Sequence, residues 1–344
     1  MQRKHITVGG VTVGGDAPVV IQSMTTTKTC DVPATVAQIR CLEAAGCELI
    51  RVAVPDMTAA RAIAAIKAQI AIPLVADIHF DYRLALESVA AGANGIRINP
   101  GNIGDDDRVR QVAHACAGRG LPIRIGVNSG SLERDIVAKF GHTPEAMVES
   151  ALHHVSLLNR FDFDDICLSV KSSGVPDTVA AYRLLHSRTS YPLHLGVTEA
   201  GTAYIGTIKS AIGIGSLLLD GIGDTIRVSL TDDPVEEIKA ALAILQSLEL
   251  RRFGPNIVSC PTCGRCDIDL IPLVREVERR LEGSTREITV AVMGCAVNGP
   301  GEAAAADYGI AGGVGEGLLF RHGEVVGKVP MERLVDALLD LIAE

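Results

Sequence analysis

The stretch PLVADIHFDYRLALESVAAGANGIRINPG (73–101) decides the fold, because it holds one complete strand–helix–strand unit. Its first and last parts are short apolar runs of strand character, and the part between them has helical periodicity. The same order recurs along most of the chain. Strand-like runs lie at 19–26, 47–54, 73–80, 95–101, 122–128, 165–173, 192–199 and 224–230.

Helical segments separate these runs, for example at 34–46, 57–69 and 144–160. Eight alternating units over about 230 residues predict an α/β fold with an N-terminal (β/α)8 TIM barrel. A doubly wound open sheet is the alternative. Against it, no G-x-G-x-x-G motif follows the first strand. The opening ITVGGVTVGGDAP (6–18) predicts a β-hairpin ahead of the barrel.

The pattern changes near RRFGPNIVSC (251–260). Beyond it, the sequence predicts a helix at about 269–282, a strand at 287–294, two short strands and a final helix at about 331–343. We therefore expect two domains: the barrel at 1–252 and a smaller α+β domain at 253–344.

Composition narrows the class of protein. The chain has 344 residues and a net charge of −9, which argues against nucleic acid or an anionic membrane as the main partner. No signal-peptide core and no apolar run of membrane-spanning length is present, so we expect a soluble cytoplasmic protein. Nine cysteines in such a protein indicate thiols or a metal site rather than disulfides. Five of them are scattered through apolar segments and read as core residues.

Polar residues recur near the C-terminal ends of the strand-like runs. Residues i and i+2 of a strand point to the same side, so these side chains share the inward face of the predicted barrel. Aliphatic side chains normally fill that interior, and polar ones at strand C-termini mark a catalytic mouth. The candidates are Arg51, Asp77, Arg97, Asn99, Arg124, Asn128, Lys171, Thr198, Arg227 and Ser229.

Five of these candidates are cations, on five different strands. They would repel one another, and only Asp77, Glu199 and Asp232 are placed to offset them. A polyanionic ligand such as a diphosphate would do so through charge-assisted hydrogen bonds. The alternative is that some of the arginines point outward and pair with helix carboxylates. Glu199, at a strand end, fits a catalytic acid and a helix cap equally well.

Cysteines gather in SCPTCGRCD (259–267), where Cys260, Cys263 and Cys266 have C-x2-C-x2-C spacing. Cys295 and Glu302 follow in MGCAVNGPGEA (293–303), whose Gly-Pro-Gly can turn the chain so that both face one point. Zinc on four cysteines is one option, although a second C-x2-C pair is missing. A ferredoxin-type cluster would need C-x2-C-x2-C-x3-C, and the fourth cysteine of that pattern is absent. A cluster with three thiolates and one exchangeable oxygen ligand is the third option.

The combined pattern SCPTCGR…GCAVNGPGEA resembles the 4-hydroxy-3-methylbut-2-en-1-yl diphosphate synthase family, the iron–sulfur enzymes of the methylerythritol phosphate route to isoprenoids. The resemblance extends through VVIQSMTTT, ADIHF, RINPGNIG, RIGVNSGSLE, SVKSS and LGVTEAG, and so covers nearly the whole chain. It implies a TIM barrel that binds 2-C-methyl-D-erythritol 2,4-cyclodiphosphate. It also implies a smaller domain with a [4Fe-4S] cluster.

The resemblance further implies roles for individual residues. The cluster ligands would be Cys260, Cys263, Cys295 and Glu302, which leaves Cys266 as a bystander. The phosphate contacts would fall on Arg51, Arg97, Asn99, Arg124, Asn128 and Lys171, with Thr198 and Ser229 nearby. The short bacterial form is a homodimer in which one subunit's cluster closes over the other's barrel.

The implied reaction is a two-electron reductive ring opening with loss of water. Glu302 would give up its place on the cluster to the substrate, and Asp77, Glu199 or Asp232 would protonate the departing hydroxyl. Flavodoxin or ferredoxin would supply the electrons, since the chain has no flavin or nicotinamide motif. Two other functions stay open: a barrel enzyme with a structural zinc, and a non-catalytic iron–sulfur carrier or sensor.

Overall fold

The computed structural model describes residues 3–99, 102–266, 268–295, 301 and 303–344. The chain divides into two compact units, 1–250 and 251–344, which are described one at a time. The boundary at 250/251 lies two residues before the one expected from the sequence. Within the described ranges, no helix has both the length and the apolar character needed to cross a membrane.

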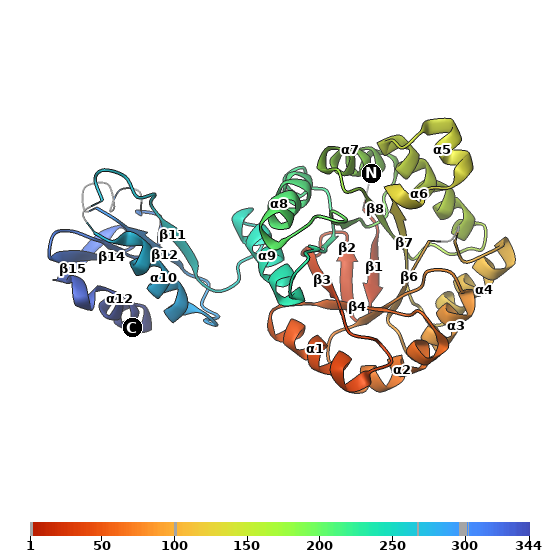
Figure 1. Ribbon diagram of the computed structural model, residues 1–344, viewed down its shortest axis with the longest axis horizontal. Helices are drawn as coiled ribbons and strands as arrows, with labels where there is room; N and C mark the ends of the chain where they lie inside the picture. Colours follow the sequence, from red (N-terminus) through yellow and green to blue (C-terminus); the bar gives the residue numbers. More distant parts are fainter. Residues whose placement is uncertain (1–2, 100–101, 267, 296–300, 302) are drawn as a thin grey trace. The chain divides into compact units, whose positions relative to one another are not determined.

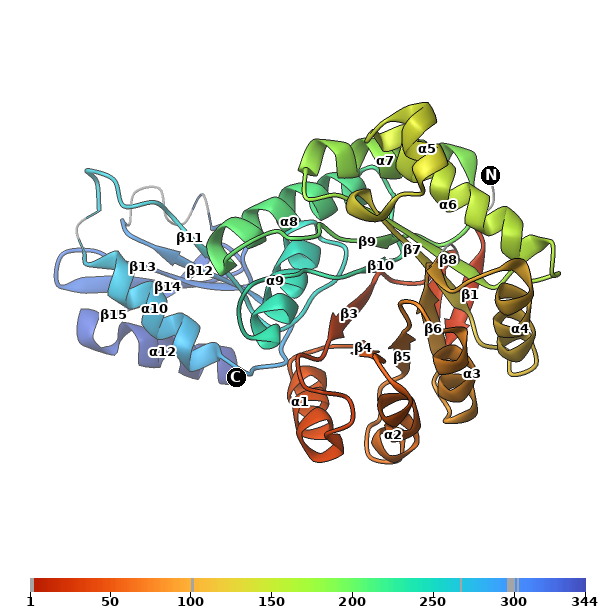
Figure 2. The ribbon, with the colours of Figure 1, turned by 45° about the vertical axis from the view of Figure 1, so that its right-hand side comes forward.

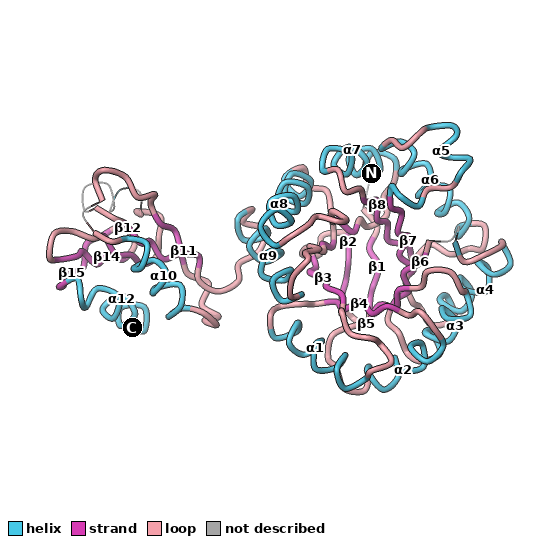
Figure 3. The backbone as a smooth tube through the Cα atoms, viewed as in Figure 1, coloured by secondary structure: helices cyan, strands magenta, loops and turns pink. Residues whose placement is uncertain are grey.

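The first unit is built on eight parallel strands in its described part (Figure 1, Figure 3). They are β3 (Val20–Met24), β4 (Leu49–Ala53), β5 (Leu74–Asp77), β6 (Gly95–Ile98), β7 (Ile123–Asn128), β8 (Ile166–Lys171), β9 (His194–Leu195) and β10 (Thr225–Ile226). Each strand pairs with the next, and β10 pairs back onto β3. A bridge between Leu168 and Leu193 links β8 to the β9 segment and closes the ring. The predicted TIM barrel is therefore confirmed.

Helices surround this ring, as the two ribbon views show (Figure 1, Figure 2). They are α1 (Val32–Ala44), α2 (Met57–Lys67), α3 (Tyr82–Ala90), α4 (Asp106–Ala117), α5 (Arg134–Phe140), α6 (Pro144–Asn159), α7 (Val175–Arg188), α8 (Ala203–Leu219) and α9 (Pro234–Ser247). Side-chain oxygens accept hydrogen bonds from first-turn backbone N–H groups in six of them, at Asp31, Asp56, Asp81, Asp105, Thr143 and Asp233. These caps explain where the helices begin after each strand.

Strands β9 and β10 are much shorter than their apolar runs, only two residues each. The buried Lys171 side chain lies close to the backbone just after β9. A β-carbon on Gly196 would lie 2.6 Å from Lys171 Nζ and 2.7 Å from the Arg227 carbonyl oxygen. Thr198, Arg227 and Ser229 therefore follow these strands rather than belonging to them.

The predicted N-terminal hairpin is present as β1 (His5–Val8) and β2 (Val11–Gly14). Its two-residue turn, Gly9–Gly10, has φ of 55° and 96°, a conformation that glycine adopts without strain. Ile6, Val8 and Val13 pack against residues at the N-terminal ends of the barrel strands, such as Val20 and Leu49. The hairpin therefore covers that end and leaves the C-terminal end for a ligand.

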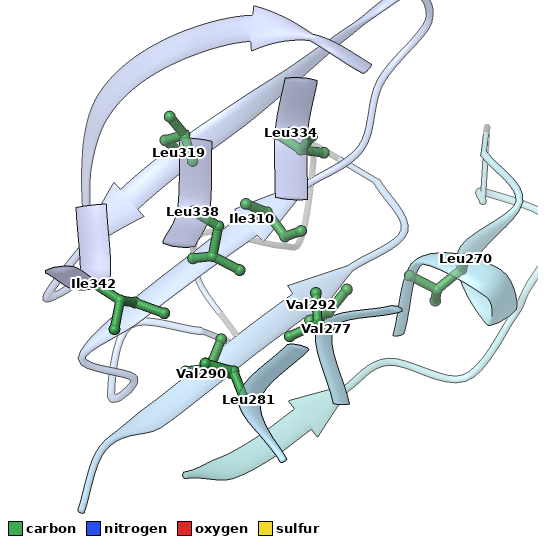
Figure 4. Close-up of a cluster of buried hydrophobic side chains, with 10 residues drawn as sticks. All are labelled: Leu270, Val277, Leu281, Val290, Val292, Ile310, Leu319, Leu334, Leu338 and Ile342. Atoms are coloured by element: carbon green, nitrogen blue, oxygen red, sulfur yellow. The ribbon is translucent and has the colours of Figure 1, made fainter. Parts of the chain in front are cut away.

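The second unit has a five-stranded mixed sheet in its described part: β11 (Asn256–Ser259), β12 (Thr289–Met293), β13 (Tyr308–Ala311), β14 (Glu316–Arg321) and β15 (Glu324–Pro330). Two helices, α10 (Leu270–Leu281) and α12 (Leu334–Ala343), pack on this sheet through a cluster that includes Val277, Val292 and Leu338 (Figure 4). The predicted α+β domain is confirmed. Sequence analysis missed β11 and β13, which are short and become strands by pairing with β12.

Candidate functional site

A cavity opens at the C-terminal end of the barrel strands. Its empty volume is about 770 Å³, part of which is open to solvent. Nine of the inward-facing candidates line it: Arg51, Asp77, Arg97, Arg124, Asn128, Lys171, Thr198, Arg227 and Ser229. Strand alternation thus brings side chains from β4 to β8, and from the segments after β9 and β10, to one place.

Asp77 is the central anion of this cavity. Arg97 Nη1 lies 3.1 Å from Asp77 Oδ1, and Arg51 Nε lies 3.5 Å from Oδ2. His79 Nε2 approaches Oδ1 at 3.5 Å. Burial opposes ionisation of this carboxyl, yet His79, Arg51 and Arg97 together hold its pKa well below its usual range. Asp77 is therefore an orienting anion for the two arginines.

Glu237 is a second anion, which sequence analysis missed. It lies on α9, is 5% exposed, and approaches Arg227 Nη2 through Oε2 at 3.8 Å. Its Oε1 accepts a hydrogen bond from the backbone N–H of Leu230, and Ser23 donates to Oε2. The sequence feature that could have revealed Glu237 is an acidic residue on the apolar face of a helix, beside Ile238 and Ala241.

Lys171 is buried with no hydrogen bond or ion pair among the described residues. The pKa of Lys171 lies well below its usual value, mainly because the side chain is buried. The positive charges of its neighbours lower it further: Arg227, Arg51, Arg124 and Arg97. Such an ammonium is costly to keep charged until an anion comes near. The side chain reaches the cavity because Gly196 has no β-carbon in its way.

Arg124 spans the barrel from its cavity toward β3. Its Nη1 donates a hydrogen bond to Oε1 of Gln22, which sequence analysis also missed. Arg124 Nη2 and Arg227 Nε are buried and have no hydrogen-bond partner in the described part of the chain. Buried guanidinium donors without acceptors indicate that an anionic ligand completes the site.

Three of the residues singled out from the sequence are not brought to the cavity. Asn99 is buried but is not among the lining residues. Glu199 is exposed and has a φ of 52°, a left-handed turn that ends the run after Thr198. Asp232 is exposed and accepts a hydrogen bond from the backbone N–H of Asp233. Glu199 and Asp232 were expected to offset the cations of the cavity. In the structure, Glu237 lies beside Arg227 instead.

A pair between buried His154 and partly exposed Glu133 holds the segment that follows β7 and Asn128. His154 Nε2, on α6, lies 2.5 Å from Glu133 Oε1, and Ser150 donates a hydrogen bond to Oε2. Burial opposes its ionisation, but these partners hold the pKa of Glu133 at about 2. The pair therefore ties the loop next to the cavity to the helix layer.

The second unit holds the clustered cysteines. A β-carbon on Gly294 would lie 2.6 Å from Cys266 Sγ and 3.5 Å from Cys260 Sγ, so this glycine leaves room for two sulfurs. The backbone N–H of Gly294 also donates to Cys260 Sγ at 3.2 Å. Cys295 follows Gly294 directly and is buried, whereas Cys263 is exposed.

No three ligating side chains already converge on one point among the described residues, and Glu302 lies outside them. Thiols around a glycine, with a backbone N–H directed at one sulfur, nevertheless fit an iron–sulfur group, which prefers thiolate ligands and N–H···S bonds.

Two family models match the chain. That of the GcpE TIM-barrel domain matches residues 3–242, and that of the GcpE protein C-terminal domain matches residues 256–344. The chain belongs to the GcpE family. The resemblance inferred from the motifs is thereby confirmed over both units.

Curated relatives of the GcpE family match over almost their full length. A protein of Geobacter sulfurreducens is 60% identical, over 98% of this chain and 96% of the relative. A protein of Ruminiclostridium cellulolyticum is 59% identical, over 100% of this chain and 98% of the relative. Both are named 4-hydroxy-3-methylbut-2-en-1-yl diphosphate synthase (flavodoxin). Among solved structures, the 3-dehydroquinate dehydratase of Geobacillus kaustophilus shares the fold alone, at 13% identity and a TM-score of 0.50, over 71% of this chain and 97% of that one.

Proposed function

We propose that the chain is a 4-hydroxy-3-methylbut-2-en-1-yl diphosphate synthase that reduces 2-C-methyl-D-erythritol 2,4-cyclodiphosphate with electrons from flavodoxin. Ferredoxin is the alternative donor. The observation that carries this proposal is the barrel cavity, which five cations line together with the carboxylate of Asp77. Asp77 pairs with Arg51 and Arg97, and Glu237 pairs with Arg227, so Arg124 and Lys171 have no carboxylate partner among the described residues. In a chain about 60% identical to relatives of that name, a diphosphate is the ligand that best completes such a cavity.

The cations would clamp the two phosphates. Arg124 and Arg227 offer unpartnered buried N–H groups, and Lys171 offers an unpaired ammonium. Arg51 and Arg97 are held in place by Asp77, so little further ordering is needed when the ligand binds. Asn128, Thr198 and Ser229 add neutral hydrogen-bonding groups. The clamp would fix the carbon skeleton of the substrate in one orientation.

The residues proposed to hold a [4Fe-4S] cluster are Cys260, Cys263, Cys295 and Glu302. When bound, such a cluster supplies one-electron transfer and a Lewis-acidic iron for the substrate oxygen. Glu302 is the exchangeable member of this set, since a carboxylate is a weaker ligand for a thiophilic metal than a thiolate.

A proton must reach the departing hydroxyl. Asp77 is held ionised by its three neighbours and is therefore better suited to orienting Arg51 and Arg97 than to donating a proton. Glu199 and Asp232 follow β9 and β10 at the mouth end of the barrel. Neither side chain lines the cavity in the free protein, so we propose that Glu199, which adjoins the cavity residue Thr198, approaches the hydroxyl once the substrate is bound.

The assembly is also part of this proposal. We propose a cytoplasmic homodimer in which the barrel of one subunit works with the cluster unit of the other, as the resemblance implies.

Electron paramagnetic resonance of anaerobically purified, dithionite-reduced protein tests the function. We expect the signal of a reduced iron–sulfur cluster, and a change in that signal when the cyclodiphosphate is added. Zinc without iron or acid-labile sulfide in the purified protein would favour the structural-zinc alternative instead. A cluster signal that the cyclodiphosphate leaves unchanged would favour the carrier or sensor.

A further inference from the structure

Cys266 lies outside the proposed ligand set, yet its sulfur lies beside that of a proposed ligand. Cys266 Sγ and Cys260 Sγ both lie within 3.5 Å of the position that a β-carbon on Gly294 would occupy. The backbone N–H of Cys266 donates to the carbonyl oxygen of Cys263 at 2.9 Å, and this turn carries Cys266 back toward the end of β12. Both half-buried side chains pack against the core cluster of the second unit.

Two of the five cysteines expected in the core, Cys30 and Cys41, are exposed instead. The other three are poorly suited to oxidation. Cys47, Cys116 and Cys167 are buried in the barrel unit, and burial raises the pKa of each thiol to about 12. A thiol that does not ionise is a poor nucleophile toward an oxidant. Cys260 and Cys266, by contrast, are half-buried, and their sulfurs lie around one glycine.

We propose that Cys260 and Cys266 form a reversible disulfide when the cluster is absent, and that this disulfide protects Cys260 for later reloading. The oxidant class is a hydroperoxide. The Cys260 thiolate attacks the O–O bond of hydrogen peroxide, takes one oxygen as a sulfenic acid and releases one water. The Cys266 thiol then attacks that sulfur, and the second oxygen leaves as water. Two thiols lose two electrons and two protons, and the peroxide is reduced to two waters.

The disulfide excludes two other fates of Cys260. A sulfur in a disulfide cannot bind iron, so oxidised protein cannot be loaded until a dithiol reduces it. It also cannot proceed to the sulfinic acid, which dithiols do not reverse. This protective consequence rests on the proposed function, in which Cys260 holds iron, whereas the disulfide itself does not.

Peptide mapping of the full-length protein tests the pairing. The protein is stripped of iron anaerobically with a chelator, treated with hydrogen peroxide, alkylated, and digested with trypsin without reduction. Trypsin cleaves between Arg265 and Cys266, so the disulfide joins two peptides that otherwise separate. We expect the joined pair in the parent protein and in Cys263→Ser, and its loss in Cys260→Ser. Alkylated Cys266 in the parent, or a joined pair that persists in Cys260→Ser, would overturn the proposal.

Reloading tests the protection. Cys266→Ser is compared with Cys41→Ser, which removes an exposed thiol from α1. Each iron-free protein is treated with hydrogen peroxide and then reduced with dithiothreitol. Iron and sulfide are added back, and the amounts bound per chain are measured. We expect full recovery in Cys41→Ser, and a loss of about fivefold or more in Cys266→Ser, with sulfinic acid at Cys260. Equal recovery in the two variants would contradict protection.

Unoxidised Cys266→Ser should take up as much iron and sulfide as the parent protein. Failure of this variant alone to load would make Cys266 a cluster ligand and would overturn the proposal. Failure of every unoxidised protein to bind iron would instead refute the proposed function, and the peptide map would still report on the disulfide.

Discussion

At the scale of single residues, charge balance inside the barrel explains most of the site. Asp77 is 3% exposed and lies within 3.5 Å of cationic nitrogens of Arg51 and Arg97. Removal of one member of a buried pair leaves the other charges without compensation, which costs more than the pair contributes. The polar interior is therefore stable only as a matched set.

Asp77→Asn should lower the free energy of unfolding by about 3 kcal/mol, because Arg51 and Arg97 would remain buried without their carboxylate. Urea denaturation measures this change. Glu149→Gln is the matched control, since Glu149 pairs with Arg188 at the partly exposed surface of the barrel. That pair should contribute less than about 1 kcal/mol. Equal losses in the two variants would show that Asp77 has no special electrostatic role.

Lys171 should take up a proton when an anion binds. Its pKa in the free protein is lowered, and a bound phosphate raises it again, so binding in the pH window between these two values favours the protonated form. Affinity for inorganic pyrophosphate should fall as pH rises through the lowered pKa. Titration calorimetry in buffers of different ionisation enthalpy measures the uptake.

Lys171→Met should abolish that uptake, whereas Lys239→Met, which alters an exposed lysine of α9, should leave it unchanged. Proton uptake that survives in Lys171→Met would assign it to another group of the cavity.

The sequence predicted the residues of the cavity better than it predicted their partners. Alternation along β4 to β8 placed six of them on the inward face, because the period of two is a property of the backbone. The other three line the cavity from the segments that follow β9 and β10. Alternation did not predict that Glu237 of α9 would reach Arg227, because a helix residue's depth depends on how the helix packs. Glu302 lies outside the described residues, so its role as a ligand stays a prediction.

At the scale of elements, the closing strands of the barrel are shaped by what they enclose. Their apolar runs predicted ordinary strands, but the ladder at β9 and β10 is two residues long. A β-carbon on Gly196 would lie less than 3 Å from both Lys171 Nζ and the Arg227 carbonyl oxygen. A short pattern of apolar residues cannot reveal such an approach, because it depends on a side chain of another strand.

Gly196→Ala should therefore displace Lys171. We expect the affinity for pyrophosphate to fall about tenfold or more, and the fold to lose about 1–3 kcal/mol of stability from overpacking. Gly215→Ala is the matched control, because no atom lies within 4 Å of a β-carbon built at that position of α8. That variant should bind normally and gain about 0.5–1 kcal/mol from helix propensity. Normal pyrophosphate binding by Gly196→Ala would contradict this account of the cavity.

At the scale of the whole molecule, the chain combines two units with different chemistry. The barrel collects cations, and the second unit collects thiols. Both units could be predicted from the sequence because alternating βα units and clustered cysteines are local patterns. Strands β11 and β13 could not, since their pairing with β12 depends on residues far along the chain.

The proposed shared site of a homodimer predicts complementation. Lys171→Ala and Cys260→Ala should each be inactive alone. Subunits of the two variants, mixed under conditions that allow exchange, should recover about a quarter of the parent activity, because half of the dimers then hold one intact combination. No recovery after demonstrated exchange would show that each chain uses its own two units.

The most direct measurement of the central claim is turnover of the cyclodiphosphate itself. Iron-loaded protein is incubated anaerobically with 2-C-methyl-D-erythritol 2,4-cyclodiphosphate and reduced flavodoxin, and the products are followed by phosphorus NMR. The account predicts that the cyclic diphosphate signals are replaced by those of a linear diphosphate, and that Lys171→Ala abolishes the change. Persistence of the cyclic signals, with a full complement of iron and sulfide and with flavodoxin still reduced, would contradict it.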